Sequence, residues 1–223
     1  KLFNRLSLLN HTNILHYREM YINMRKRTCH LVMDYITHPT LTDYIYRRID
    51  NSEPLRETEM KEIMRQLFDV IRFLHSKRLC HRDVKPDNIL FNRPQGKIWL
   101  IDFGVSKIML ERNVPKVMMT NTGTCEYKAP EIYEGGKYTE SIDLWAAGVV
   151  LFEMVERQLP FSREYLSDVI QCIMDVDYEC GEVWLELSKH AKDLLGRLLK
   201  PAAKRLTAEE ALESLWFTEG DRN

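Results

Sequence analysis

Four polar residues in the stretch that begins at His81 are the ones most able to do chemistry. Asp83 can accept a proton from a hydroxyl nucleophile, and Lys85 can neutralise a phosphoryl group during its transfer. Asn88 can hold a metal ion, and Asp102, nineteen residues after Asp83, can supply a second metal ligand. If the fold brings these side chains to one point, they predict phosphoryl transfer.

Two short apolar runs lie between the candidate metal ligands. Residues 89–91 and 97–101 have the composition of strands, and they flank the turn sequence Asn-Arg-Pro-Gln-Gly. They predict a β-hairpin. Because the open ends of a hairpin lie side by side, this element would carry Asn88 and Asp102 to the same edge.

The remaining elements follow from hydrophobic periodicity. Residues 58–76 form an amphipathic helical pattern, with apolar side chains at 60, 63, 64, 67, 70, 71 and 74. Residues 141–155 are apolar nearly all round except for Asp143 and Glu153, which predicts a helix buried on most sides. The other predicted elements are strands at 17–23 and 28–36 and helices at 1–9, 162–175, 188–199 and 207–216, with Ser188 as an N-cap and Thr207 and Glu210 in a capping box.

The composition is that of an ordinary globular protein with one large domain: 223 residues, 44% apolar and 29% charged. The net charge of -1 gives no field that attracts nucleic acid or anionic lipid, and no apolar run is long enough to span a membrane. We therefore expect no nucleic-acid and no membrane partner. Five cysteines without paired spacing fit a reducing compartment, which predicts a cytoplasmic or nuclear protein. Because the first residue is Lys1 rather than Met, we expect a piece of a longer chain.

Three motifs in order carry a resemblance to a known family. The sequences His-Arg-Asp-Val-Lys-Pro-Asp-Asn at 81–88, Asp-Phe-Gly at 102–104 and Ala-Pro-Glu at 129–131 resemble the catalytic loop, magnesium loop and activation-segment end of eukaryotic protein kinases. Lys85 and the sequence Gly-Thr-Cys-Glu-Tyr-Lys before Ala129 are similar to Ser/Thr kinases, and the second half of the chain is closest to the calcium/calmodulin-dependent group.

The resemblance covers roughly residues 1–217 and implies an α+β, protein-kinase-like fold. A mostly helical large lobe would occupy residues 37–217, and a truncated antiparallel β small lobe would occupy residues 1–36, with a hinge at 33–36 and a tail at 218–223. The implied reaction moves the γ-phosphoryl group of ATP, with Mg²⁺ as cofactor, to Ser or Thr hydroxyls of protein substrates.

The resemblance also implies a role for individual residues. Asp83, Lys85 and Thr124 would be catalytic, and Asn88 and Asp102 would bind magnesium. ATP would lie against Met33, Asp34, Ile36 and Leu90. The supporting contacts would be His81 under Phe103, Asp143 on the backbone of the catalytic loop, and an ion pair between Glu131 and Arg205.

Regulation and specificity are further implications. Arg82 and Lys107 are cations without an obvious anion, so a phosphate on Thr120, or on the runner-up Thr122, is expected to order the activation segment. Asp87 and Glu153 stand where related kinases place carboxylates against a substrate Arg, so basic residues before the phosphoacceptor are expected. Thr40 stands where another carboxylate often helps.

Several parts of the family pattern are absent from the sequence. It has no Gly-rich phosphate loop and no strand Lys before His11, and these parts are expected upstream of Lys1. The helix Glu should fall near Leu2 or before it, but the first Glu is Glu19. The alternative function is a pseudokinase scaffold that binds partners without catalysis. A small-molecule kinase is disfavoured, because the sequences at 123–124 and 129–131 shape a peptide platform. The regulators, including calcium or calmodulin, are not specified by the sequence.

Overall fold

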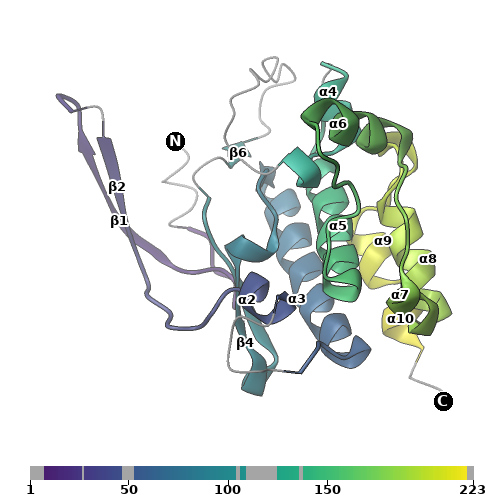
Figure 1. Cartoon of the computed structure of the whole chain (residues 1–223). Helices are drawn as coiled ribbons and strands as arrows, with labels where there is room; N and C mark the ends of the chain where they lie inside the picture. The colour runs from purple at the N-terminus through teal and green to yellow at the C-terminus, as the bar shows by residue number, and fades with distance from the viewer. Residues whose placement is uncertain are drawn as a thin grey trace.

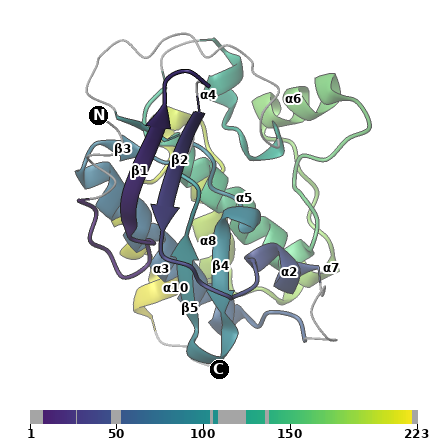
Figure 2. The ribbon, with the colours of Figure 1, turned by 90° about the vertical axis from the view of Figure 1, so that its left-hand side faces the viewer.

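A hairpin of two antiparallel strands projects from a mainly helical body (Figure 1). The computed structural model describes residues 8–26, 28–46, 53–103, 106–108, 125–135 and 138–219. The hairpin consists of β1 (Tyr17–Asn23) and β2 (Thr28–Met33), which lie side by side in Figure 2. The predicted second strand reached residue 36, and this prediction is wrong by three residues. The strand ends because its partner ends: after Asp34 N–H donates to the His16 carbonyl, no facing strand continues among the described residues.

The hairpin is joined to the body through the segment that precedes it. Asn13 is buried, and its side-chain amide donates to Gln66 Oε1 (2.8 Å) and to the Ile98 carbonyl (2.9 Å). The Asn13 carbonyl accepts from Leu100 N–H (2.9 Å), and Ile14 forms a parallel bridge with Leu100. The start of the hairpin is therefore fixed to the body by buried hydrogen bonds.

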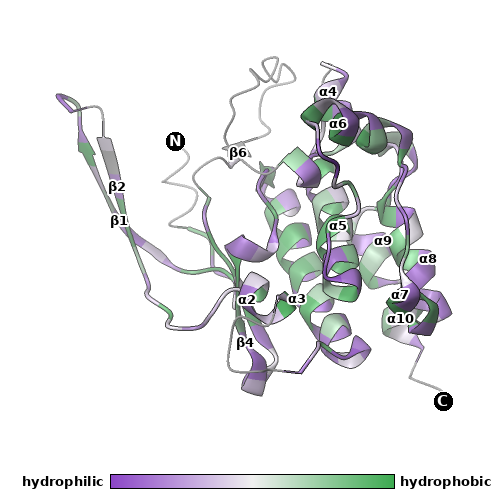
Figure 3. Cartoon of the chain, in the orientation of Figure 1, coloured by the Kyte–Doolittle hydropathy of each residue, from purple (hydrophilic) through white to green (hydrophobic). Residues whose placement is uncertain are grey.

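The body is built on two long helices, α3 (Glu57–Ser76) and α5 (Ile142–Glu156). The apolar positions predicted for the first helix are all buried in α3, together with Phe68. The helix predicted to be buried on most sides is present as α5, in which every residue from Ile142 to Val155 is buried, including Asp143 and Glu153. Figure 3 shows hydrophobic residues concentrated on these two helices. Within the described residues, no helix combines the length and the apolarity that crossing a membrane requires.

The predicted central hairpin is present. β4 (Ile89–Asn92) pairs antiparallel with β5 (Lys97–Leu100), in a register that places Ile89 opposite Leu100. The turn is a short 3₁₀ segment that ends at Gly96, whose φ of 59° lies in the left-handed region that glycine tolerates. Two strands of two residues each, β3 (Leu79–Cys80) and β6 (Lys107–Ile108), form a further antiparallel pair.

Shorter helices complete the body. They are α2 (Leu41–Ile45), α4 (Pro130–Tyr133), α6 (Leu166–Asp175), α7 (Glu182–Glu186), α8 (Lys189–Leu198), α9 (Ala208–Leu212) and α10 (Leu215–Thr218). Ser188 accepts from Ala191 N–H, and Thr207 and Glu210 form the predicted capping box.

Three predicted helices differ from the structure. The helix expected at 162–175 begins only at Leu166, because the chain is still extended at Tyr165. The helix expected at 207–216 is two helices, because the extended backbone of Ser214 ends α9 and starts α10. The helix expected at 1–9 lies mostly outside the described residues, and residues 8–9 are not helical.

Candidate active site

The loop between β3 and β4 places three of the four predicted chemical side chains in contact. Lys85 Nζ lies 3.0 Å from Asp83 Oδ2, and Asn88 Nδ2 donates to the same oxygen at 2.8 Å. Asn88 Nδ2 also donates to the Asp83 carbonyl at 2.8 Å, which fixes the loop backbone. The Asp83 carboxylate is thus held between an ammonium group and an amide while remaining partly accessible.

Asp102 reaches the same edge through the hairpin β4–β5. Ile101 N–H donates to the Asn88 carbonyl at 2.9 Å, so the residues that precede and follow the hairpin are hydrogen-bonded to each other. Asp102 has a φ of 60° and Arg82 a φ of 73°, which are left-handed conformations that cost a non-glycine residue free energy. Both strained residues flank the candidate site, and the structure brings Asn88 and Asp102 to one edge as predicted.

Asp143, at the start of α5, holds the backbone of the loop through its carboxylate. Its carboxylate accepts from His81 N–H (2.9 Å) and from Arg82 N–H (2.8 Å), which are the backbone contacts predicted for it. It also pairs with His75 Nε2 at 2.9 Å. Burial alone would raise the pKa of Asp143, but the hydrogen bond and charge of His75, with the other donors, lower it.

His75 was not predicted to have a role, because no motif marks it. Its signal in the sequence is only its place in the last turn of the helix that ends before the loop.

His81 packs against Phe103, as predicted, with the ring centroids 4.8 Å apart and the rings nearly perpendicular. Its Nε2 lies 3.0 Å from the Ile101 carbonyl. Burial lowers the pKa of His81, although Asp143 acts against this shift, so the ring is neutral at pH 7. A neutral His that donates to a carbonyl holds the loop in place rather than exchanging protons with solvent.

The predicted ion pair of Glu131 with Arg205 is present and buried. Arg205 Nη1 and Nη2 lie 2.7 and 2.9 Å from the two oxygens of Glu131, and the guanidinium lies 5.1 Å from the centre of the Trp145 ring. Arg205 also donates to the carbonyls of Lys200 and Ser141. This bidentate pair connects α4, which follows the activation segment, to the C-terminal helices.

Glu153 has surroundings that the sequence did not predict. Its Oε1 accepts from the hydroxyl of Tyr46 at 2.8 Å, and its Oε2 accepts from the hydroxyl of Tyr127. Asp87 is exposed. Thr40, for its part, is used in the capping box of α2, where its backbone N–H and hydroxyl both donate to Asp43.

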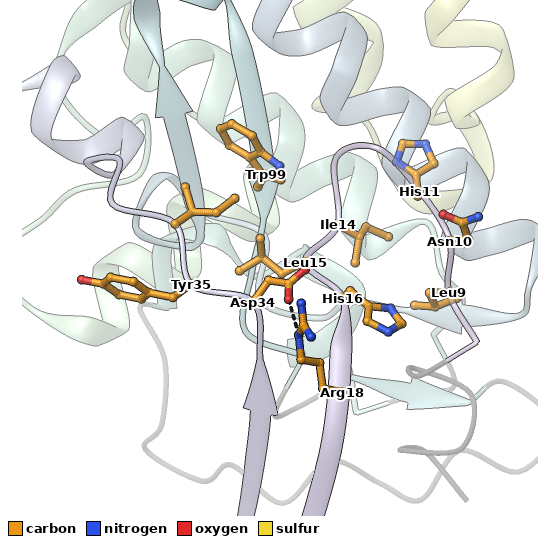
Figure 4. A pocket seen from close by; sticks show the side chains of 11 residues that line it. Leu9, Asn10, His11, Ile14, Leu15, His16, Arg18, Asp34, Tyr35 and Trp99 are labelled. Carbon is orange, nitrogen blue, oxygen red and sulfur yellow. Dashed lines mark hydrogen bonds and ion pairs between the residues drawn. The ribbon is translucent and has the colours of Figure 1, made fainter.

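Two of the four residues predicted to contact ATP, Asp34 and Ile36, line one cavity. A pocket of about 620 Å³ is lined by Asp34 and Ile36, together with residues of the segment 9–18, Tyr35 and Trp99 (Figure 4). The ion pair of Arg18 with Asp34 lies at this pocket. Met33, Leu90 and the loop residues 81–88 are not among its lining residues.

Several predicted residues lie outside the described part of the chain. These are Thr120, the runner-up Thr122, Thr124 and Gly104. The backbone of Lys107 is described, and it pairs with Cys80 across β3 and β6, but its side chain is not described.

Comparison with known proteins places this geometry in context. A family model described as "Protein kinase domain" matches residues 3–217. "Myosin light chain kinase A" of Dictyostelium discoideum is 31% identical over 222 residues, which cover 98% of this chain and 72% of that protein. "Putative ribosomal protein S6 kinase alpha-2" of Caenorhabditis elegans is 35% identical over 207 residues, which cover 84% of this chain but only 26% of that protein.

A solved structure gives the same result. The autoinhibited serine kinase domain of the giant muscle protein titin superposes with a TM-score of 0.85 at 27% identity, over 97% of this chain and 66% of that one. The chain therefore spans a quarter to about three quarters of the length of these known proteins.

Proposed function

Because the chain belongs to the protein kinase domain family, we propose that the protein that carries it is a Ser/Thr kinase, which transfers the γ-phosphoryl group of ATP to hydroxyls of protein substrates. The observation that carries the proposal is the Asp83 carboxylate, held by Lys85 and Asn88 at 3.0 and 2.8 Å. A carboxylate fixed in this way can orient a substrate hydroxyl and take its proton.

On this proposal the remaining polar groups have distinct tasks. Lys85 would balance negative charge on the phosphoryl oxygens, and Thr124, which lies outside the described residues, would be a catalytic partner of Asp83 and Lys85. The side-chain nitrogen of Asn88, Nδ2, already donates to Asp83. The side-chain oxygen of Asn88, Oδ1, is therefore the atom that would bind a cation. Together with the Asp102 carboxylate it forms a set of oxygen ligands that suits Mg²⁺, which proteins bind through few side chains and the phosphates of the substrate. A magnesium ion held there would neutralise charge on those phosphates.

The nucleotide and the lobes follow from the same proposal. Residues 1–36 would be the remnant of the small lobe, residues 37–217 the large lobe, and residues 218–223 a tail. The adenine would lie at the hinge 33–36, near Met33, Asp34 and Ile36, with Leu90 below it. Two backbone contacts support this placement: Thr40 forms an antiparallel β-bridge with Leu90, and Phe91 N–H donates to the Pro39 carbonyl. Together these contacts fix the segment that follows the hinge to β4.

The direct test is Asp83→Asn in the full-length protein. The substitution keeps size and hydrogen bonding but removes the proton acceptor, so peptide phosphorylation is expected to fall by about a hundredfold or more while the unfolding temperature is unchanged. The control is Asp193→Asn, an exposed carboxylate on α8. A wild-type protein that phosphorylates no protein or peptide would favour the pseudokinase alternative, and an Asp83→Asn variant that keeps more than a tenth of the activity would contradict the role of Asp83.

We also propose control through the activation segment and a modest preference for basic substrates. A phosphate on Thr120 would make charge-assisted hydrogen bonds to Arg82 and Lys107. Unchanged activity of Thr120→Ala, together with active protein that carries no phosphate at Thr120, would contradict this control. The support for the substrate preference is Asp87, an exposed carboxylate four residues from Asp83.

A further inference from the structure

One buried carboxylate joins three elements beside the catalytic loop. Glu153 lies near the end of α5 and is 2% exposed. Its two oxygens accept one hydroxyl each: Oε1 from Tyr46, which ends α2, and Oε2 from Tyr127, which lies three residues after Thr124. Both acceptor atoms of the carboxylate are therefore engaged by tyrosines from separate elements.

The surroundings of Glu153 have an excess of negative charge. No Lys, Arg or His of the described residues forms an ion pair with it. Burial raises the pKa of Glu153, the two tyrosine hydroxyls lower it, and the charge of Asp87 raises it. Two carboxylates thus lie close to the loop that holds Asp83, without a protein cation between them. A cation supplied by a bound peptide would be attracted to this place.

Tyr46 controls access to this charge. It is 39% exposed, whereas Tyr127 is 9% exposed, so of the two rings Tyr46 is the one that faces solvent. A guanidinium binds a carboxylate best through both oxygens, as a bidentate pair. Because Glu153 is buried and the Tyr46 hydroxyl donates to Oε1, an arginine of a substrate has to displace Tyr46 to reach this oxygen.

This inference rests on the proposed kinase function and makes it more specific. We propose that Tyr46 is a specificity-determining residue, which closes Glu153 to arginine side chains of the substrate. The wild-type protein then recognises basic residues through Asp87, whose exposed carboxylate discriminates weakly because water screens it. The structure thereby separates the two carboxylates that the sequence had paired: Asp87 is open to the peptide and Glu153 is not.

The test is a positional peptide library with the full-length protein and its Tyr46→Phe variant. Each peptide has one Ser or Thr acceptor, and Arg or Ala alternates at each of four positions on either side. In the wild type we expect the Arg-to-Ala ratio of kcat/KM to stay below about threefold at every position, as a screened surface carboxylate allows. In Tyr46→Phe the ratio is expected to rise about tenfold at one position, mainly through KM, because Oε1 loses the hydroxyl that covers it and can accept a charge-assisted hydrogen bond from the guanidinium.

Two further variants control the test. Tyr44→Phe removes a hydroxyl from the same helix, where the ring packs on Phe91 rather than on Glu153, and should leave the library profile unchanged. Adding Glu153→Gln to Tyr46→Phe should abolish the new arginine preference. Because each ratio compares two peptides on the same enzyme, a loss of folded protein cancels.

The outcomes distinguish this inference from the proposed function. An unchanged profile in Tyr46→Phe would overturn it, and so would a strong arginine preference in the wild type that Glu153→Gln removes. A wild-type protein that phosphorylates none of the peptides would instead contradict the proposed function, and the inference would fail with it.

Discussion

The guanidinium of Arg205 has no accessible surface and depends on Glu131 to balance its charge. Removing one partner of a buried ion pair leaves an uncompensated charge, which typically costs about 3 to 5 kcal/mol. We therefore expect Glu131→Gln to lower the free energy of unfolding by about that amount, as measured by urea denaturation. The loss should be smaller when Arg205→Met is added, because the second substitution removes the unpaired charge.

An exposed ion pair of the same type provides the control. Arg197 and Asp193 lie one turn from each other on α8, with Arg197 Nη1 3.8 Å from Asp193 Oδ2. Both side chains are about half exposed. Asp193→Asn is expected to change the free energy of unfolding by less than about 0.5 kcal/mol. Equal effects of Glu131→Gln and Asp193→Asn would show that burial does not determine the strength of these pairs.

At the scale of single residues, the sequence predicted the contacts of residues that lie in or next to a recognised motif. The contacts of Asp143 with the loop and of His81 with Phe103 followed from the resemblance. The partners of Glu153 did not, because a hydroxyl that reaches a carboxylate from a distant helix leaves no pattern in the sequence. Gln66, which binds Asn13 and the Gly96 carbonyl, was missed for the same reason.

Among the elements, α3 is fastened to the turn of the hairpin β4–β5 by one carboxylate. Glu59 accepts from Arg93 at 2.7 and 3.0 Å and from the backbone of Arg56 at 3.0 Å. Burial alone would raise the pKa of Glu59, but the hydrogen bonds of Arg93 and Arg56 hold it at about 2.

This lowered pKa predicts a dependence of stability on pH. In the unfolded chain the carboxyl titrates near about 4.3, so the stabilisation is complete above that pH and is lost as the pH falls from about 4.3 to about 2. After allowance for solvent screening, we expect it to amount to about 1 to 2 kcal/mol. Urea denaturation of Glu59→Gln at pH 7 and pH 3 measures it, since the difference between variant and wild type should shrink at the lower pH.

Glu62, exposed on the same helix, provides the matched control. Its substitution by Gln should leave the pH profile of stability as it is in the wild type. A Glu59→Gln variant with the same profile as the wild type would show that the pairing with Arg93 is not maintained in solution.

The elements that the sequence predicted are those long enough to show a period. α3 and α5 span 20 and 15 residues. Spacing predicted the buried positions of α3 except Phe68, and the nearly continuous apolar sequence predicted the burial of α5. α2, α4 and α7 span five, four and five residues, which is too short for a helical period to appear, and none was predicted. Their positions depend on contacts with other elements rather than on their own sequence.

For the molecule as a whole, the sequence of 223 residues contains no Gly-rich phosphate loop. Positioning and electrostatic stabilisation supply most of the rate of phosphoryl transfer, so Asp83 and the proposed metal ligands would have little to act on without that part. We expect these residues, expressed alone, to show no micromolar binding of MgATP by isothermal titration and no phosphate transfer. Exposed Tyr21, Ile22 and Met24 on the hairpin should also favour aggregation.

A thermal unfolding curve on the same sample shows whether the polypeptide is folded when it is titrated. Micromolar binding by a folded sample, or measurable turnover, would show that the nucleotide can be held without a Gly-rich loop.

The burial of α5 also bears on how the molecule opens. Amide hydrogens in a helix that is covered on all sides exchange with solvent deuterium only when the whole structure unfolds, whereas those of a hairpin whose side chains are mostly exposed on both faces exchange through small local openings. The amides of α5 should therefore exchange most slowly, and those of β1 and β2 among the fastest. Since Asp143 belongs to α5, the carboxylate that accepts from the backbone of His81 and Arg82 lies on the part of the molecule that we expect to open last.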